Sequence, residues 1–265
     1  MNASISRLLP ALAVGALVLT GCSSTSDEPT PNASGSSAVA LVKSGTLTVC
    51  TNPPFAPFEF EEDGKIVGLD MDVTNEIAKD LGVTQSVINV GFDAMESGAA
   101  LNAGQCDIVA TGLSITDARK QNVDFSEPYF EADLGLLVKA GSGIASEADL
   151  AGKKIAVQKA TVGNDWVEDK GLAGVQFDDL GLQVQSLNTG QVDAVINDYA
   201  VLGTYASDDL ELTATFPTDD VYGLAVKKGN TALLTQVNAT LERIKSDGTW
   251  VSIHTDRIGV APAEG

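Results

Sequence analysis

An arginine and an aspartate of this sequence each lie shortly after a predicted buried strand, and together they could hold the two ends of a zwitterion. Arg119 can form two parallel, charge-assisted hydrogen bonds with a carboxylate, and Asp198 can accept hydrogen bonds from an ammonium group. Thr116 or Asp117 is expected to be the N-cap of a short helix, whose free amides also attract an anion. An anion site opposite a cation site would fit the head group of an α-amino acid.

Each of these residues also has a simpler explanation. Arg119 could pair with Asp117 or Asp124 on the surface of a helix, and Asp198 could be the N-cap of another helix. Their position at equivalent points of an internal repeat favours a shared site.

The repeat comprises residues 101–109 (LNAGQCDIV) and 187–195 (LNTGQVDAV). Each copy is typical of a helix end, a glycine in the left-handed capping conformation, and a buried strand. Upstream, residues 47–49 and 155–157 each open a strand after a glycine-containing turn. We therefore predict two similar α/β lobes. Because ligands of open α/β sheets bind at the carboxyl ends of strands, we expect the segments that follow the two repeats to face each other.

Apolar periodicity and turn residues predict alternating strands and helices in both lobes. In the first lobe the predicted elements are strands at 46–51, 86–90 and 107–110, a hairpin at 58–67 that turns at Asp63 and Gly64, and helices at 71–81 and 94–103. In the second lobe they are strands at 155–157 and 194–196 and helices at 164–168 and 180–187. This alternation predicts an α/β fold with two mostly parallel sheets and right-handed crossovers.

Two apolar segments, 134–139 and 222–227, are interpreted as crossing strands that join the lobes, and a helix at 231–245 returns the chain to the first lobe. We expect lobe one to comprise residues 41–136 and 226–265, and lobe two to comprise residues 137–225. Two crossings form a hinge, and a hinge between two lobes forms a cleft that can close.

A stiff aromatic loop follows the first strand. Three prolines between residues 53 and 57 remove backbone donors and restrict the loop. We expect the Phe55 ring to stack on the aliphatic part of a ligand, whereas Phe58 is expected in the core. Phe92 follows another predicted strand and is a candidate for the opposite wall, although most aromatic side chains of α/β proteins belong to the core.

The N-terminal residues predict export. A single cation, Arg7, precedes the apolar run 8–19, which is too short to span a bilayer and fits a signal peptide at residues 1–21. The sequence LTGC at 19–22 resembles a bacterial lipobox, which predicts lipidation of Cys22 and an anchor in the membrane. Residues 22–40 are rich in Ser, Thr, Pro and Gly and are expected to form a flexible tether.

Charge and cysteine content restrict the classes of partner. With 16 Lys and Arg against 36 Asp and Glu, the net charge of −20 argues against nucleic-acid binding. Besides Cys22, the chain has Cys50 and Cys106, and an extracytoplasmic pair suggests a disulfide. Strand spacing opposes that bridge, because it puts the two residues on adjacent strands at different heights. With one histidine and no clustered ligands, we expect neither a metal nor a cofactor.

Several motifs together resemble the polar amino-acid-binding proteins of ABC transporters, solute-binding family 3. They are PPFAPFEF at 53–60, GLDMD at 68–72, GQCD at 104–107, SITDAR at 114–119, DFSEPY at 124–129 and DGT at 247–249. The resemblance runs from about residue 45 to residue 253. It implies a two-lobed, type II periplasmic-binding-protein-like fold, and a monomeric receptor that closes on a polar amino acid and delivers it to an ABC permease.

The resemblance also implies roles for individual residues. Arg119, Thr111, Ser114 and Thr161 match positions that hold the ligand carboxylate in the family. Asp198 matches the position that holds the ligand ammonium, with help from the main chain near Gly112.

The sequence departs from the family pattern at four places. Val162 stands in a turn that usually reads Gly-Thr-Thr, so it offers only its backbone. Asn52 replaces an Asp that is frequent in receptors for cationic ligands, which disfavours lysine and arginine. The stretch 92–101 is about two residues longer than usual, which weakens the assignment of Phe92. Lys159 could favour an acidic ligand or simply face solvent.

Two other classes of function are weighed against this receptor. A cyclohexadienyl dehydratase-like lyase on the same fold would need an acid–base group in the cleft, and Glu59 is the only candidate near the aromatic loop. A sensor module of a signalling protein or wall enzyme is disfavoured because we expect no further domain. The sequence leaves glutamate, glutamine and other polar neutral amino acids open as ligands.

Overall fold

The computed structural model describes residues 39–262. The predicted signal peptide at 1–21, the lipidation site Cys22 and nearly all of the tether at 22–40 lie outside the described residues. Within the described part of the chain, no helix combines the length and the apolar character needed to cross a membrane.

The first lobe is built on a five-stranded sheet with the order β4-β1-β5-β12-β6. Its strands are β1 (Thr46–Thr51), β4 (Thr84–Asn89), β5 (Ile108–Val109), β6 (Val123–Phe125) and β12 (Ala225–Lys227). β1 runs parallel to β4 and β5, and β12 is antiparallel to both β5 and β6. The hairpin of β2 (Phe60–Glu62) and β3 (Lys65–Val67) turns at Asp63 and Gly64, as predicted.

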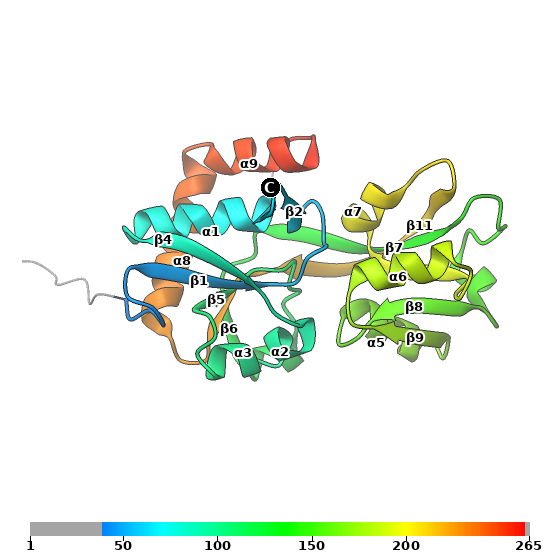
Figure 1. Ribbon diagram of the computed structural model, residues 1–265, viewed down its shortest axis with the longest axis horizontal. Helices are drawn as coiled ribbons and strands as arrows, with labels where there is room; N and C mark the ends of the chain where they lie inside the picture. The colour runs from blue at the N-terminus through cyan, green and yellow to red at the C-terminus, as the bar shows by residue number, and fades with distance from the viewer. Residues whose placement is uncertain (1–38, 263–265) are drawn as a thin grey trace, which may run out of the picture. The chain divides into compact units, whose positions relative to one another are not determined.

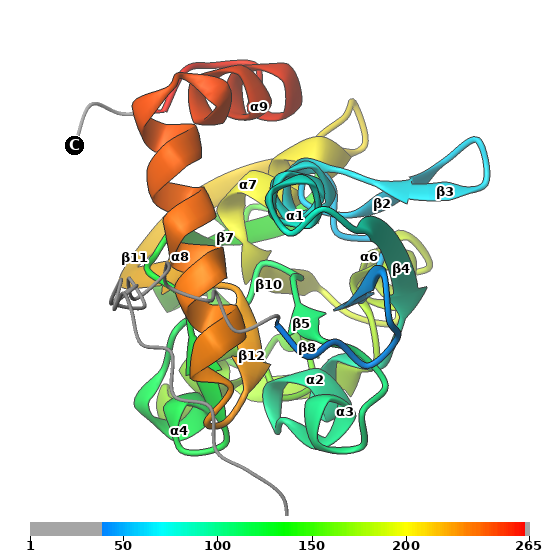
Figure 2. The ribbon, with the colours of Figure 1, turned by 90° about the vertical axis from the view of Figure 1, so that its left-hand side faces the viewer.

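Helices cover both faces of this sheet. They are α1 (Leu69–Asp80), α2 (Phe92–Glu96), α3 (Ala99–Asn102), α8 (Thr231–Ser246) and α9 (Thr249–Ile258). Figure 2 shows α1 on one side of β1 and β5 and the short helices α2 and α3 on the other. Arg243 of α8 holds α8 against α1 through Glu76 and Asp80, at 2.8 and 2.9 Å.

The second lobe has its own five-stranded sheet, with the order β11-β7-β10-β8-β9. Its strands are β7 (Phe130–Lys139), β8 (Lys154–Gln158), β9 (Ala173–Phe177), β10 (Ala194–Asp198) and β11 (Leu210–Tyr222). β8, β9 and β10 are parallel, and β7 is antiparallel to β10 and β11. The helices α5 (Val162–Asp169) and α6 (Leu180–Asn188) flank β8, and α7 (Tyr199–Leu202) follows β10 (Figure 1).

The internal repeat corresponds to equivalent structure in the two lobes. Gly104 and Gly190 both adopt the left-handed conformation after a helix, with φ of 66° and 74°. Asp107 accepts a hydrogen bond from the Thr48 amide, and Asp193 accepts one from the Lys154 amide, each at 2.8 Å. Each aspartate therefore fixes the strand next to its own, so the two sheets are assembled by the same device.

β7 and β11 connect the lobes. They form a long antiparallel ribbon that begins with the pair Phe130–Tyr222 and ends with the pair Lys139–Leu210. The register shifts between Phe216 and Asp220, where Pro217 cannot donate to the ladder. The predicted crossing at 134–139 is part of β7. The predicted crossing at 222–227 is wrong as a single strand, because it comprises the end of β11, a break at Gly223 and Leu224, and β12. The predicted lobe boundaries stay a prediction.

The predicted helix at 94–103 is two helices. Gly98 lies between them with φ of 73°, and a Cβ there would lie 2.9 Å from Cγ1 of Val123. The close approach of Val123 and the left-handed backbone end α2 before α3 begins. Phe92, which follows β4 as predicted, is the first residue of α2.

Cys50 and Cys106 form a disulfide, with their Cα atoms 5.7 Å apart. The strand-spacing objection fails because Cys106 precedes β5 instead of lying on it, so the register of the sheet does not fix its height.

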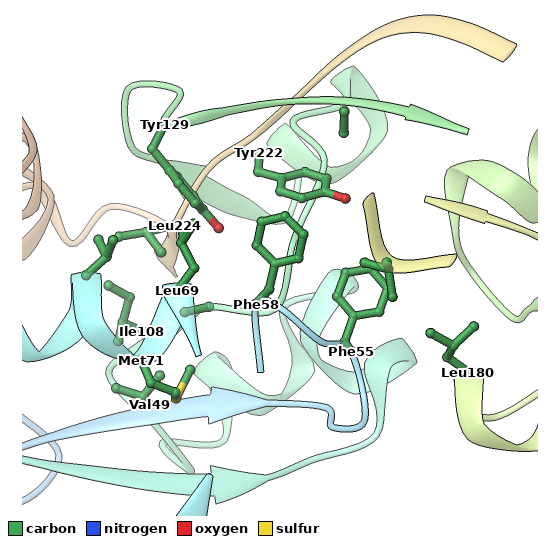
Figure 3. Close-up of a cluster of buried hydrophobic side chains, with 14 of the residues drawn as sticks. Val49, Phe55, Phe58, Leu69, Met71, Ile108, Tyr129, Leu180, Tyr222 and Leu224 are labelled. Carbon is green, nitrogen blue, oxygen red and sulfur yellow. The ribbon is translucent and has the colours of Figure 1, made fainter. Parts of the chain in front are cut away.

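An aromatic cluster fills the core at the carboxyl ends of the strands. Phe58 is fully buried, as predicted, and its ring centroid lies 5.2 Å from that of Tyr222 and 5.9 Å from that of Phe55. Figure 3 shows Phe58 between these two rings, with Leu180 of the second lobe beyond Phe55. The cluster supports the aromatic loop from below, so the Phe55 ring has a fixed position.

Candidate functional site

One cavity lies where the strand ends of the two lobes meet. Its space measures about 420 Å³, including the part open to solvent. All eight predicted ligand-binding residues line it: Phe55, Phe92, Thr111, Gly112, Ser114, Arg119, Thr161 and Asp198. Six further residues complete the lining, of which the sequence had pointed only to Asn52 and to the backbone of Val162: Asn52, Leu134, Gln158, Val162, Gly163 and Asn197.

Arg119 of α4 (Asp117–Lys120) is a buried cation in this cavity. Its side chain is 5% exposed, and its Nη1 and Nη2 donate to the carbonyls of Ser114 and Ala160, both at 2.9 Å. Its guanidinium lies 5.4 Å from the centroid of the Phe92 ring, within range of a cation–π interaction. Two carbonyls use only part of the five N–H groups of a guanidinium, so donors remain for an anion.

The surface pairings considered for Arg119 are wrong. Asp117 faces Lys120 at 3.5 Å and Asp124 faces Lys228 at 2.7 Å, while Arg119 points into the protein. Thr116 caps α4, because its hydroxyl accepts from the Arg119 amide at 3.2 Å. The cap fixes the start of α4, and the bonds of the guanidinium to the Ser114 and Ala160 carbonyls hold the side chain at the cavity.

Acidic groups surround Arg119. Glu96 Oε2 lies 3.8 Å from its Nε. Burial lowers the pKa of Arg119, and the negative charges of Glu96, Asp165, Asp198 and Asp220 oppose that change. The cation stays ionised, because a guanidinium is not deprotonated in proteins.

Asp198 ends β10 and lies on the opposite side of the cavity. It occupies the N-cap position of α7, but its side chain makes no capping hydrogen bond. N-capping of α7 was the simpler explanation for Asp198. Because the side chain does not cap the helix, that explanation does not account for the carboxylate. The pKa of Asp198 is raised to about 7, mainly by burial and also by the nearby charge of Asp220, whereas Tyr222 and Arg119 oppose the rise. A ligand cation beside it would favour the ionised form.

Thr161 contributes less directly than the sequence suggested. It is the N-cap of α5, where its hydroxyl accepts from the Asn164 amide at 3.2 Å and donates to the Gln158 carbonyl at 2.7 Å. Because the Thr161 hydroxyl already donates its only hydrogen, the donors left on this side of the cavity are the first backbone amides of α5, at Val162 and Gly163. Amides in the first turn of a helix have no partner inside the helix and attract anions.

Two amide side chains meet across the cleft. Gln158 Nε2 donates to Asn52 Oδ1 at 3.0 Å and to the Asp178 carbonyl at 3.2 Å. Both residues directly follow or end predicted strands, which is the signal that would have identified them. Their remaining amide atoms offer a ligand side chain an uncharged donor and an uncharged acceptor.

A layer of buried polar groups lies behind the cavity. The Thr111 hydroxyl is hydrogen-bonded to Glu59 Oε1, and the Gly112 amide donates to Asp70 Oδ2 at 2.8 Å. Glu59 is fully buried and does not line the cavity. The acid–base group considered for a lyase is therefore separated from any ligand by Thr111.

Lys159 is not part of the lining. Its Nζ lies 3.1 Å from Oδ2 of Asp93, so it pairs across the cleft instead of facing the cavity or solvent alone. Within residues 39–262, no group of three or more His, Cys, Asp or Glu could hold a metal ion.

Comparison with known proteins identifies the family. Residues 47–259 match the model of the bacterial extracellular solute-binding proteins, family 3. The chain belongs to this family.

Relatives and solved structures agree with this assignment. The chain is 36% identical over 207 residues to the ABC transporter glutamine-binding protein GlnH of Bacillus subtilis (strain 168), covering 76% of each. An ancestral arginine-binding protein bound to arginine superposes with a TM-score of 0.76 at 38% identity, over 80% of this chain and 98% of that one. The arginine-, lysine-, histidine-binding protein ArtJ from Geobacillus stearothermophilus has a TM-score of 0.77 at 34% identity, over 82% and 97% of the two chains.

Membership in solute-binding family 3 confirms the two-lobed fold and the main interpretation of the sequence. The chain is an extracellular solute-binding protein, and its relatives are binding proteins of amino-acid ABC transporters. These matches favour the receptor over the lyase, which the buried position of Glu59 also disfavours.

Proposed function

We propose that this chain is the receptor of an ABC importer, that lipid on Cys22 anchors it to the outer face of the cell membrane, and that it binds one polar amino acid between its lobes. It works as a monomer, needs no cofactor, and passes its ligand to a permease. The family and the transporter relatives support the transport role. The lipobox-like sequence at 19–22 supports the anchor.

The single observation that carries the proposal is the arrangement of Arg119 and Asp198. The two side chains come from different lobes, line the same cavity, and have opposite charges. A ligand with a carboxylate and an ammonium group would bridge them, with Thr111, Ser114 and the amides of α5 assisting at the carboxylate. Neither lobe alone provides both charges.

Because Arg119 and Asp198 belong to different lobes, the two lobes must close to hold one ligand between them. We infer that the ligand first contacts lobe one and that lobe two then adds Asp198 and Gln158. The bond from Arg119 to the Ala160 carbonyl and the contact of Asn52 with Gln158 exist only when the lobes meet. Ligand contacts made only in the closed form shift an existing equilibrium between open and closed forms.

The lining favours an uncharged polar ligand side chain. Arg119 and Asp198 are the only ionisable side chains among the lining residues, and the ligand head group uses both. The Asn52–Gln158 pair then matches a carboxamide such as that of glutamine, the ligand in the name of the GlnH relative. Acidic groups around Arg119 disfavour glutamate, because a second ligand carboxylate would be repelled.

A thermal-shift panel of the common amino acids tests this function. A bound amino acid raises the melting temperature as its concentration exceeds its Kd. We expect a large shift with L-glutamine, and no shift for Arg119→Ala or Arg119→Lys, because lysine lacks the planar fork. Lys120→Ala, which removes the exposed neighbouring cation, should keep the full shift.

Two results would contradict the proposal. One is a shift that survives in Arg119→Lys when that variant melts normally without ligand. The other is turnover of prephenate or arogenate, which would favour the lyase.

A further inference from the structure

We propose that Glu59 carries a proton in the folded protein and donates it to Thr111, so that the Thr111 hydroxyl presents its own hydrogen to the ligand carboxylate. This inference rests on the proposed function, and it makes Glu59 a positioning residue for that site. Glu59 itself touches no ligand, because it lies outside the lining of the cavity.

The geometry contains two carboxyl groups with unequal surroundings. Asp70 of α1 accepts from the Gly112 amide at 2.8 Å and from the Tyr129 hydroxyl at 2.7 Å. Glu59 has the Thr111 hydroxyl at one oxygen, and its Oε2 has no hydrogen-bond partner. Both side chains are fully buried. Fixed donors stabilise a carboxylate; burial and the charge of Asp70 raise the pKa of Glu59 and outweigh the Thr111 and Thr51 hydroxyls and the Asn52 amide, which lower it, so the negative charge belongs on Asp70.

The absence of cations reinforces this assignment. Among the described residues, neither Glu59 nor Asp70 forms an ion pair with a lysine or arginine. Two unpaired carboxylates side by side in a buried layer would repel each other and lose their hydration. Burial raises the pKa of Glu59 well above its usual range, and the charge of Asp70 raises it further. Burial raises the pKa of Asp70 to about 6.

The groups that face Glu59 come from four elements. They are Thr51 of β1 with the following Asn52 amide, Asp70 of α1, Thr111 after β5, and Tyr129 before β7. Tyr222 of β11 belongs to the same aromatic cluster, and Asp70 raises the pKa of its hydroxyl slightly after stronger effects of burial and of Asp198. The pKa of Tyr129 is raised well above its usual range by burial and by Asp70, so both phenols stay neutral. Asp70 is therefore the group whose ionisation Glu59 senses.

The direction of the hydrogen bond between Glu59 and Thr111 decides whether the Thr111 hydroxyl offers the ligand a donor or an acceptor. A hydroxyl has a single hydrogen, so it can donate to Glu59 or to the ligand but not fully to both, while its lone pairs remain able to accept. If Glu59 donates, Thr111 is free to donate to the ligand carboxylate. If Glu59 were ionised, Thr111 would donate backward and would present lone pairs to an anionic group. The proton is held and not transferred, so no covalent step is involved.

Infrared difference spectroscopy on the ligand-free protein tests the location of the proton. The spectrum of wild type minus Glu59→Gln, with glutamate labelled at its side-chain carboxyl, should contain the carbonyl stretch of a protonated acid at neutral pH. Glu61→Gln, which alters an exposed glutamate of the same hairpin, should leave that band in place. A carboxylate band in its place at neutral pH would overturn the inference, whatever the ligand.

Binding of L-glutamine and L-arginine tests the consequence. Thr111→Val should weaken binding by about tenfold, as expected for a lost hydrogen bond to a charged group. Thr111→Ser and Glu59→Gln should bind within about threefold of wild type, because serine keeps the hydroxyl and glutamine can donate to it as a neutral acid does. Equal losses in Glu59→Gln and Thr111→Val, or no loss in Thr111→Val, would also overturn the inference. If neither amino acid binds wild type, the proposed function fails, while the infrared result still decides where the proton lies.

Discussion

At the scale of single residues, the titration of Asp198 gives the site a pH dependence. Its carboxylate must be ionised to hold an ammonium group, and its pKa of about 7 puts the transition near neutrality. We expect affinity for the bound amino acid to fall as pH falls below about 7, by up to about tenfold per pH unit. Asp198→Asn should bind weakly at every pH, as calorimetry between about pH 5 and 8 would measure. A wild-type affinity that stays constant over this range would contradict the role of Asp198.

Ionisation of Asp198, which should strengthen ligand binding, should lower the stability of the ligand-free protein. Because its pKa is raised by folding, the folded state binds the proton more tightly than the unfolded state does. The stability that this proton provides is complete below the unfolded pKa of about 3.9 and is lost as pH rises through about 7. Asp198→Asn should therefore be more stable than wild type at about pH 8 and equal to it at about pH 4. Asp208→Asn changes an exposed aspartate and is the matched control; its free energy of unfolding should equal that of wild type at both pH values.

The charged residues that line the cavity were easier to find from the sequence than the neutral ones. Arg119 and Asp198 could be found because their charges lie at equivalent points of a repeat. Gln158 and Asn197 carry no charge, and their position at a strand end is a weaker signal, since an uncharged polar residue there is common and has many roles. Thr161 was assigned to the ligand, yet its hydroxyl caps α5, and only the backbone geometry reveals that.

At the scale of elements, the segment that follows β5 must pass close beneath the aromatic loop. Gly112 has φ of 52°, and a Cβ there would lie 2.6 Å from Cε1 of Phe55 and 3.2 Å from Cε2 of Tyr222. We expect Gly112→Ala to lower the free energy of unfolding by about 1–3 kcal/mol through overpacking, and to weaken ligand binding by displacing Phe55. Denaturant unfolding and calorimetry would measure the two effects.

Gly82, which follows α1, provides the control for this substitution. It has φ of 68°, and a Cβ there would meet nothing within 4 Å. Gly82→Ala should cost only about 1 kcal/mol for the left-handed backbone and should leave affinity unchanged. Equal effects at the two glycines would show that the contact with Phe55 is unimportant.

Elements with strong apolar periodicity were predictable, and those whose pattern depends on tertiary contacts were not. The strand at 46–51 matches β1 residue for residue because all six side chains are buried. β9 was missed because it is a largely exposed edge strand with a weak pattern. β11 was missed because Pro217, Thr218 and Asp219 resemble a turn, and the register shift that accommodates them is visible only beside β7. The helix at 94–103 was predicted whole because nothing local identifies the close contact at Gly98.

At the scale of the whole receptor, one ion pair reports on closure. Lys159 and Asp93 belong to different lobes, and both side chains are about half exposed, at 53% and 54%. An exposed pair is worth about 0.2–1 kcal/mol, so Asp93→Asn should weaken amino-acid binding by about 1.4- to fivefold. The loss should vanish at high salt, because exposed charges are then screened.

A second exposed pair serves as the reference for this measurement. Lys170 and Glu147 lie 2.9 Å apart within lobe two, so closure does not change them. Lys170→Gln should therefore leave affinity unchanged at any salt concentration. If both pairs affect binding equally, Lys159 and Asp93 have no special part in closure.

The interruption of the ribbon between Phe216 and Asp220 has a mechanical consequence. Because Pro217 donates nothing to β7, the joint can flex at this point without breaking a rung of the ladder. Thr218 spans the interruption instead, because its amide donates to Oδ1 of Asp133 at 3.3 Å and its hydroxyl donates to the Ala132 carbonyl at 3.1 Å. A change of angle at this joint would therefore strain two hydrogen bonds that depend on side chains and leave the regular ladder on either side intact. Substitution of Thr218 or Asp133 should change how readily the two lobes close without altering the residues that line the cavity.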